Sequence, residues 1–166
     1  MPRPILRATG LGLGLALACL FSGLSGAAVA AEATDAGVPD FSGWLEGPEG
    51  LIAAISLGQE QRKPLLLYFY TDWCGYCRQF ERELLAQPEL RDYLASIVAV
   101  RINPESGPAE AAMAQRYGVR SFPSLFVHSG ESQAVSKVDR VELVRGRPVL
   151  MAPAKFIDVI KTAGAR

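Results

Sequence analysis

Apolar and polar residues follow one another along the chain in blocks that predict alternating strands and helices. The run 65–70 is almost wholly apolar, as expected for a central strand covered on both faces, and 97–102 is rich in β-branched residues. Apolar residues at helical spacing predict helices over 48–57, 74–86, 89–94, 109–117 and 153–163. In the first helix Leu51, Ile52 and Ile55 are expected on the apolar side, with Leu57 as a further candidate, and a polar exit follows from Gly58 to Pro64. A further strand is expected directly after Pro123, and another over 138–144, where apolar and polar residues alternate.

This order of elements indicates the α/β class, with a central mixed sheet flanked by helices. The sheet should contain a parallel pair of strands and an antiparallel hairpin. Gly118 stands where the helix 109–117 should stop, and the bond between Phe122 and Pro123 is a candidate cis peptide. The stretch 131–139 is longer than a usual hairpin turn, which fits either a flap for a specific partner or a tolerated insertion.

The first 30 residues have the parts of a signal peptide and are not expected to belong to the fold. Arg3 and Arg7 are basic, 11–24 is apolar, and small residues precede a cleavage site after Ala30. An uncleaved anchor is the alternative, although the apolar run is short and rich in glycine for a membrane span. Cys19 follows a weak lipoprotein box, so a lipid anchor at this residue is a second alternative.

Cleavage after Ala30 leaves 136 of the 166 residues, enough for one domain with a modest core. We expect a flexible segment over 31–47, in which Phe41 and Trp44 tuck onto a domain that spans 48–166. The cleaved chain has 15 basic and 17 acidic residues, a net charge of −2, and contains no basic block. This charge pattern argues against nucleic-acid binding.

The segment Trp73-Cys74-Gly75-Tyr76-Cys77 carries the predicted chemistry. Its first cysteine follows a buried strand and opens a helix, where free backbone N–H groups and the helix dipole favour a thiolate. Its second cysteine lies one turn further on and is close enough to resolve a mixed disulfide. Since these are the only cysteines after residue 30, the chain is not a disulfide scaffold, and the pair is expected to act on the disulfides of other proteins.

Two other uses of a Cys-x-x-Cys motif are weighed against this interpretation. A zinc site needs about four ligands, and beside the two cysteines the cleaved chain offers one histidine, His128. A purely structural disulfide would close a loop too short to restrict the unfolded chain much. We expect no metal and no cofactor, because the two sulfurs carry the electrons.

Three separated features of the sequence resemble the thioredoxin family. They are the 73–77 motif, the segment Tyr117-Gly118-Val119-Arg120-Ser121-Phe122-Pro123, and Gly146 after the last expected strand. The resemblance covers about 48–163 and implies a thioredoxin-like fold. In detail the chain is similar to the C-terminal periplasmic domain of the electron transporter DsbD, at Lys63-Pro64, 70–73, Phe80-Glu81 and 87–90. That subgroup implies a reductase or an electron relay in the periplasm.

The resemblance also implies roles for individual residues. Cys74 would be the exposed nucleophile and Cys77 the resolving thiol. The implied substrate-binding residues are Trp73, Gly75, Tyr76, Phe122 and Pro123. Trp73 would shield the pair, Pro123 would be a cis proline whose loop faces the disulfide, and the backbone of Phe122 would pair with a bound client peptide.

Two departures from the family pattern bear on the mechanism. Thioredoxin has a buried aspartate six residues before its first cysteine, where this chain has Tyr68, either a core residue or a hydroxyl that holds a water. The dipeptide Gly75-Tyr76 lacks the histidine of strongly oxidising relatives, which favours a more reducing pair.

Four polar residues near these motifs have less specific meanings. Asp72 either disfavours the Cys74 thiolate as a nearby like charge, or is a helix N-cap or a solvated loop acid. Arg78 either favours that thiolate or is a charge on the helix surface. His128 and Arg120 are expected at the surface.

We therefore expect a periplasmic thiol–disulfide oxidoreductase that reduces disulfides in client proteins and is re-reduced by a membrane electron donor of the DsbD type. A disulfide oxidase or isomerase is the first alternative, although an isomerase would need a dimerisation segment for which 136 residues leave no room. The second alternative is a redox-inactive binding module of the same fold.

Overall fold

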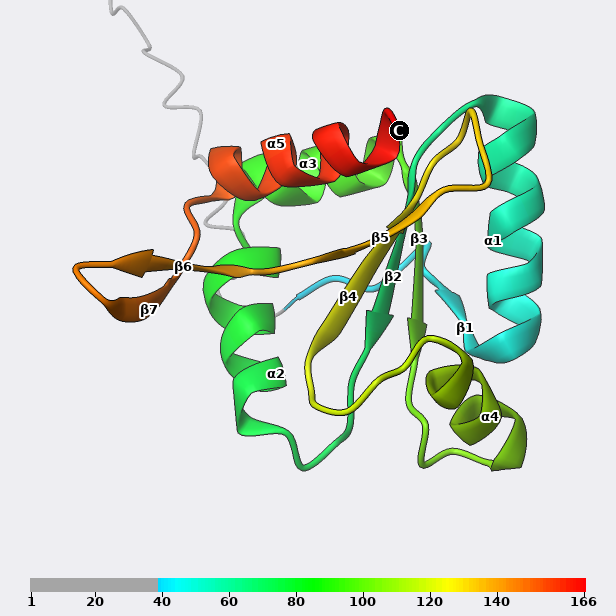
Figure 1. Cartoon of the computed structure of the whole chain (residues 1–166), viewed down its shortest axis with the longest axis horizontal. Coiled ribbons are helices and arrows are strands. Elements are labelled where there is room, and N and C mark those ends of the chain that lie inside the picture. Colours follow the sequence, from blue (N-terminus) through cyan, green and yellow to red (C-terminus); the bar gives the residue numbers. More distant parts are fainter. Residues whose placement is uncertain (1–38) are drawn as a thin grey trace, which may run out of the picture. The chain divides into compact units, whose positions relative to one another are not determined.

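The structure, a computed structural model, describes residues 39–166 (Figure 1). The expected signal peptide over 1–30, the candidate lipidation site Cys19 and residues 31–38 of the expected flexible segment 31–47 lie outside these residues. Within 39–166, no helix combines the length and the apolar character that a membrane crossing requires.

The helical segments begin close to the predicted positions. They are α1 (Gly47–Gln61), α2 (Gly75–Phe80), the π-helical turn η1 (Glu81–Leu85), α3 (Pro88–Ser96), α4 (Pro108–Arg116) and α5 (Pro153–Gly164). A proline stands in the first turn of α1, α3, α4 and α5, where its missing N–H gives up no helical hydrogen bond. α2 and η1 together occupy the predicted helix 74–86.

The central sheet has five strands in the spatial order β1-β3-β2-β4-β5 (Figure 1). β1 (Leu45–Glu46) and β2 (Leu65–Phe69) run parallel to β3 (Val98–Ile102). β4 (Ser124–His128) runs antiparallel to β2, and β5 (Val135–Val138) runs antiparallel to β4. The predicted mixed sheet flanked by helices is therefore confirmed.

β2 lies at the centre of the sheet and is buried along its whole length. Because alternate residues of a strand point to opposite faces, Leu66 and Tyr68 join the core formed with α2, η1, α3 and α5. Leu65, Leu67 and Phe69 join the core formed with α1 and α4. The apolar run 65–69 thus supplies both cores, which is why it shows no alternation with polar residues.

The N-terminal end of the described chain is part of the domain. Leu45 and Glu46 pair with β3 ahead of the expected boundary at 48. Phe41 and Trp44 pack edge to face, with ring centres 5.2 Å apart, and both contact the core, as the sequence predicts. The Arg101 guanidinium lies 4.3 Å from the centre of the Phe41 ring and adds a cation–π contact.

The predictions for α1 were wrong in two respects. The helix continues past the expected polar exit at Gly58 and ends at Gln61. Its buried residues are Leu51, Ala54 and Gly58, whereas Ile52 is 63 % exposed and Leu57 38 % exposed. The helix packs through its small residues because they let its backbone approach the sheet, and a Cβ on Gly58 would lie 3.1 Å from the carbonyl oxygen of Lys63.

The prediction of a single strand over 138–144 was also wrong. β5 ends at Val138, and a separate two-stranded hairpin follows, made of β6 (Val141–Val144) and β7 (Arg147–Leu150). Gly146 lies in the turn of this hairpin and does not follow the last strand. Both turn residues have a positive φ, 51° at Arg145 and 78° at Gly146. A two-residue turn with positive φ at both positions is the form that best matches the twist of a β-hairpin.

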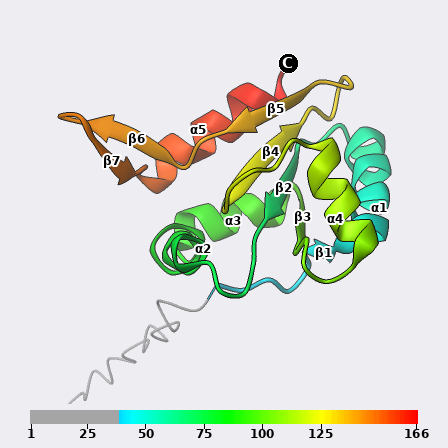
Figure 2. The ribbon, with the colours of Figure 1, turned by 60° about the horizontal axis from the view of Figure 1, so that its bottom comes forward.

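The β6–β7 hairpin therefore occupies most of the chain between β5 and α5. The stretch 131–139, predicted as a flap or an insertion, contains β5, so four of its nine residues belong to the central sheet. Figures 1 and 2 show the hairpin projecting from the domain beside the start of α5, on the side away from α1.

Candidate active site

The sheet register brings three segments together at one edge. Phe69, the last residue of β2, lies opposite Ile102 at the end of β3 and opposite Ser124 at the start of β4. The Cys-x-x-Cys motif follows β2, the loop 103–107 follows β3, and Pro123 immediately precedes β4. The site therefore forms where the carboxyl ends of two parallel strands meet the loop that enters an antiparallel one.

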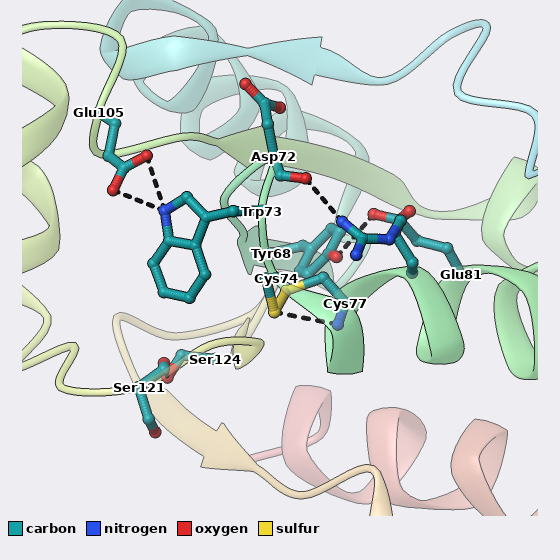
Figure 3. Close-up of a disulfide and its surroundings, with 10 residues drawn as sticks. Tyr68, Asp72, Trp73, Cys74, Cys77, Glu81, Glu105, Ser121 and Ser124 are labelled. Atoms are coloured by element: carbon teal, nitrogen blue, oxygen red, sulfur yellow. Dashed lines mark hydrogen bonds between the residues drawn. A yellow bond between two sulfur atoms is a disulfide. The ribbon is translucent and has the colours of Figure 1, made fainter.

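Cys74 is the N-cap of α2, and its sulfur is positioned by the helix that it caps (Figure 3). The backbone N–H of Cys77 donates a hydrogen bond to the Cys74 Sγ at 3.0 Å. The two cysteines form a disulfide with their Cα atoms 5.2 Å apart. Donation from a helix N-terminus to this sulfur stabilises its negative charge once the disulfide is reduced.

The two sulfurs lie beneath an exposed rim of motif side chains. Cys74 is 3 % exposed and Cys77 is 1 % exposed, whereas Trp73 and Tyr76 are 65 % and 68 % exposed. The expectation that Cys74 is exposed was therefore wrong, because its sulfur is covered within the motif, and the two cysteines differ in their positions at the cap and inside the first turn of α2. Gly75 is also exposed, and no atom lies within 4 Å of the place that a Cβ on this residue would take.

Trp73 is held from two sides. Its Nε1–H donates to both carboxylate oxygens of Glu105, at 2.9 and 3.1 Å (Figure 3). Its ring packs edge to face against Phe122, with centres 6.2 Å apart. Glu105 was not identified from the sequence, and the only available signal was its place in the loop that follows a central parallel strand.

The loop before β4 has the predicted cis peptide between Phe122 and Pro123. Pro123 is buried and Phe122 is half-buried. The Ser124 hydroxyl donates to the Ser121 carbonyl at 2.8 Å and closes this loop. In Figure 3 the segment that carries Ser121 and Ser124 faces the disulfide across the site.

Tyr68 links the core to the site through its hydroxyl. The side chain is fully buried, and the hydroxyl donates to the Glu81 Oε1 at 2.8 Å. Burial, followed by the negative charge of Glu81, raises the pKa of Tyr68 far above its ordinary value, so the hydroxyl stays protonated and remains a donor. Tyr68 is thus a core residue, which was the first of the two alternatives predicted for it. Its hydroxyl is hydrogen-bonded to Glu81.

Glu81 and Cys77 line the same small cavity on the inner side of the motif. Thr71 also lines it, and the Thr71 Oγ1 is the one buried side-chain polar atom of residues 39–166 without a hydrogen-bond partner. Arg78 and Arg101 complete its polar wall. This cavity places a carboxylate and polar groups next to the second cysteine.

The other polar candidates have structural partners. The Asp72 carbonyl accepts from the Arg78 Nη1 at 2.8 Å, and Asp72 does not cap α2, because Cys74 does. His128 lies at the end of β4 away from Pro123, half-buried rather than at the surface, with its Nε2 2.8 Å from the Tyr117 hydroxyl. Arg120 is exposed, as predicted. Within 39–166, no three His, Cys, Asp or Glu side chains are grouped as a metal site.

A disulfide that caps a helix and faces a cis-proline loop at the end of a central parallel strand defines a thiol–disulfide oxidoreductase site of the thioredoxin type. Comparison with known proteins agrees with this class. Residues 52–139 match the family described as thioredoxin-like domain, which is more than half of the chain, and the protein therefore belongs to this family.

Two relatives illustrate the similarity. The thiol:disulfide interchange protein DsbD 1 of Pseudomonas aeruginosa is 34% identical over 94 residues, which are 54% of this chain and 16% of that protein. The thioredoxin of Streptomyces clavuligerus is 38% identical over 71 residues, 43% of this chain and 61% of that protein. The chain thus matches only part of the length of either relative.

Solved structures confirm the fold. The oxidised C-terminal domain of DsbD from Neisseria meningitidis superposes with a TM-score of 0.55 and 24% identity, over 72% of this chain and 98% of that chain. A thioredoxin from Thermus thermophilus gives a TM-score of 0.53 with 23% identity, over 72% and 86% of the two chains.

Proposed function

We propose that the protein is a periplasmic thiol–disulfide oxidoreductase that reduces disulfides in client proteins. The observation that carries the proposal is the hydrogen bond from the Cys77 N–H to the Cys74 Sγ at the start of α2. It stabilises a thiolate at Cys74, and the thiolate is the species that attacks a disulfide.

The reaction starts with both cysteines reduced. The Cys74 thiolate attacks one sulfur of a client disulfide, forms a mixed disulfide and releases the other client sulfur as a thiolate that takes up a proton. Cys77 then loses its proton and attacks the Cys74 sulfur, which releases the second client sulfur as a thiolate that also takes up a proton. Two electrons pass to the client, which leaves as a dithiol, while the protein keeps the Cys74–Cys77 disulfide.

Two carboxylates, Glu81 and Asp72, belong to the cavity that Cys77 lines, and we infer that Glu81 accepts the Cys77 proton, because Asn103 binds the Asp72 carboxylate. The Tyr68 hydroxyl fixes the orientation of the Glu81 carboxylate. A general base of this kind need only lie within reach directly or through one water. Tyr68 is then a positioning residue, since its raised pKa keeps its own proton in place.

The client is bound between the motif and the cis-proline loop. Trp73, Gly75 and Tyr76 form one exposed side of this place. Pro123 and Phe122 form the other side, where the backbone of Phe122 pairs with an extended client segment. Glu105 and Phe122 together keep the Trp73 ring in position for this contact.

The motif supports electron flow from the protein to the client. Gly75-Tyr76 places no histidine between the cysteines, and the reduced pair is then less stabilised than in a strong oxidant. In an oxidising compartment the disulfide must be re-reduced, and a membrane donor of the DsbD type is the proposed source. The sequence of residues 1–30 supports export, with either a free product or one tethered at Cys19.

Trapping by single cysteine variants tests the mechanism. Cys77→Ser should accumulate covalent mixed disulfides through Cys74, and Cys74→Ser, the matched control, should accumulate few. A reduction potential nearer to about −270 mV than to about −120 mV, measured against glutathione, supports the reductase direction. A potential near the oxidising value would indicate an oxidase, and variants that leave activity in cells unchanged would indicate a binding module.

A further inference from the structure

The β6–β7 hairpin has an apolar face that no described segment covers at its outer end. Directly opposed residues of an antiparallel pair share a face, so Val141, Leu143, Pro148 and Leu150 lie together. Val141 and Leu150 are half-buried, and Leu150 packs against the core. Leu143 is 74 % exposed, the largest exposed fraction among the large apolar side chains of residues 39–166.

The two edges of the hairpin differ. Residues 140 and 151 are hydrogen-bonded to each other, from the Met151 N–H to the Arg140 carbonyl at 2.9 Å. Hydrogen-bonded and non-hydrogen-bonded pairs alternate, so the backbone groups of Val141 and Leu143 point outward from β6, and those of Pro148 and Leu150 point outward from β7. Proline has no N–H, so the β7 edge lacks one of its two donors, whereas the β6 edge offers a donor and an acceptor at both positions.

Positive charge lies at the turn end of the open edge. Arg145 follows β6, and Arg147 lies across the turn. At the other end Arg140 is half-buried and stands next to the exposed Asp139. Glu142, the one acidic residue within β6, is engaged by Lys155 of α5. An extended segment with acidic residues at the end near the turn would therefore lie beside Arg145 and Arg147.

The base of the hairpin is also close to the site. Val138, the last residue of β5, lies opposite Leu125, which is two residues after Pro123, so the chain enters the hairpin beside the cis-proline loop. A partner held at the β6 edge is therefore close, at the base of the hairpin, to the loop that faces the disulfide.

We propose that the outer edge of β6 docks an extended acidic segment of a redox partner, which adds to the hairpin as a third strand. The proposal rests on the proposed exchange of disulfides with proteins. Each strand has four residues, so the contact is too small for a stable dimer but suits a transient redox encounter. The charged residues at the very tip, Arg145 and Arg147, disfavour insertion of the hairpin into a lipid core.

The test uses the reduced protein and three synthetic peptides that share one small disulfide ring. The first ends in a tail of alternating glutamates and valines, the second has lysines in place of the glutamates, and the third has no tail. We expect reduction of the acidic peptide to be about tenfold faster than that of the basic one at low salt, with the difference shrinking at high salt.

Two variants should remove this preference without changing the rate for the peptide that has no tail. Leu143→Asp places a carboxylate on the apolar face beside the open edge, and Arg145→Glu reverses the charge at its end. Ile52→Asp is the matched control, because Ile52 is 63 % exposed on α1, on the side of the domain away from the hairpin (Figures 1 and 2). This control should keep the tenfold preference.

The outcomes separate the two proposals. If the peptide without a tail is not reduced at all, the proposed function itself fails. If all three peptides are reduced at equal rates, or if Leu143→Asp keeps the preference, the docking proposal is overturned while the proposed function stands. A dimer in sedimentation, or binding to anionic lipid vesicles, that Leu143→Asp abolishes would also overturn it, because the edge would then serve a second copy or a membrane.

Discussion

The Trp73 indole donates to both carboxylate oxygens of Glu105, at 2.9 and 3.1 Å, and so ties the residue before the first cysteine to the loop that follows β3. The two residues are 32 positions apart in the chain. The Asp72 carboxylate accepts from Asn103 of the same loop at 3.3 Å, which makes a second link between the two segments. The geometry of the exposed rim thus depends on a loop outside the motif.

Glu105→Ala should release the Trp73 ring. We expect client-protein reduction to slow about fivefold, which corresponds to about 1 kcal/mol, while reduction of a small-molecule disulfide is unchanged. Stability should fall by at most about 1 kcal/mol, because the bond is exposed. Ser106→Ala in the same loop is the control, and equal rates for Glu105→Ala and wild type with a protein client would contradict the role given to Glu105.

Tyr68 should make stability depend on pH in the alkaline range. Its pKa is raised, so above about pH 10 the unfolded chain loses this proton before the folded chain does, and the free energy of unfolding falls as pH rises. Tyr68→Phe should reduce that slope by up to about 1.4 kcal/mol per pH unit in urea titrations. At neutral pH the same variant should lose about 1 to 3 kcal/mol, because Glu81 loses its donor.

The matched control for this measurement is Tyr76→Phe, since Tyr76 is 68 % exposed and no hydrogen bond of its hydroxyl is found within residues 39–166. It should leave both the neutral stability and the alkaline slope near wild type. An alkaline slope that is the same in Tyr68→Phe as in wild type would show that the Tyr68 proton does not contribute.

His128 should give a second pH dependence on the acidic side. Burial lowers its pKa, so the unfolded chain binds a proton where the folded chain does not, and stability is lost as pH falls below about 6.5. His128 is the one histidine of the chain, and His128→Gln should therefore flatten unfolding free energy between about pH 7 and about pH 5. Tyr117→Phe keeps the histidine and should keep the slope. A wild-type slope in His128→Gln would rule this source out.

Substitution by glycine should have opposite effects on stability at two nearby positions of the β6–β7 hairpin. Arg145 has a φ of 51°, which a side chain disfavours, so Arg145→Gly should stabilise the protein by up to about 1 kcal/mol. Arg147 lies in β7, where Arg147→Gly should destabilise by about 0.5 to 1 kcal/mol. Thermal unfolding of both variants measures the two signs, and a loss of stability in Arg145→Gly would contradict the strained turn.

Local signals identify the reactive pair and most elements around it. The spacing of Cys74 and Cys77 and their place after a buried strand are readable along the chain, and a strand that starts directly after Pro123 makes the preceding bond a candidate cis peptide, which the structure confirms. The helix starts are marked by prolines, which act through the backbone of the residue itself. These features need only neighbours within a turn or a strand.

The supporting residues could not be found in the same way. Glu81 and Glu105 look like ordinary surface acids in the sequence. Glu105 meets Trp73 because the sheet register sets Phe69 opposite Ile102. Glu81 meets Tyr68 because η1 packs over that residue. The buried side of α1 was misjudged for a related reason, since Ala54 and Gly58 are buried by the closeness of the sheet rather than by their own hydrophobicity.

Short-range preferences were sufficient to define a strand, a helix cap and a pair of thiols, because each depends on residues within a few positions of one another. The tertiary structure decided three further features: the partners of polar groups that are far apart in sequence, the exposed edge of β6, and the division of 138–144 between two sheets. Each of them depends on which surfaces are covered by other segments of the folded chain. Burial and hydrogen-bond pairing are set by contacts between segments far apart in sequence, and a one-dimensional pattern does not contain those distances.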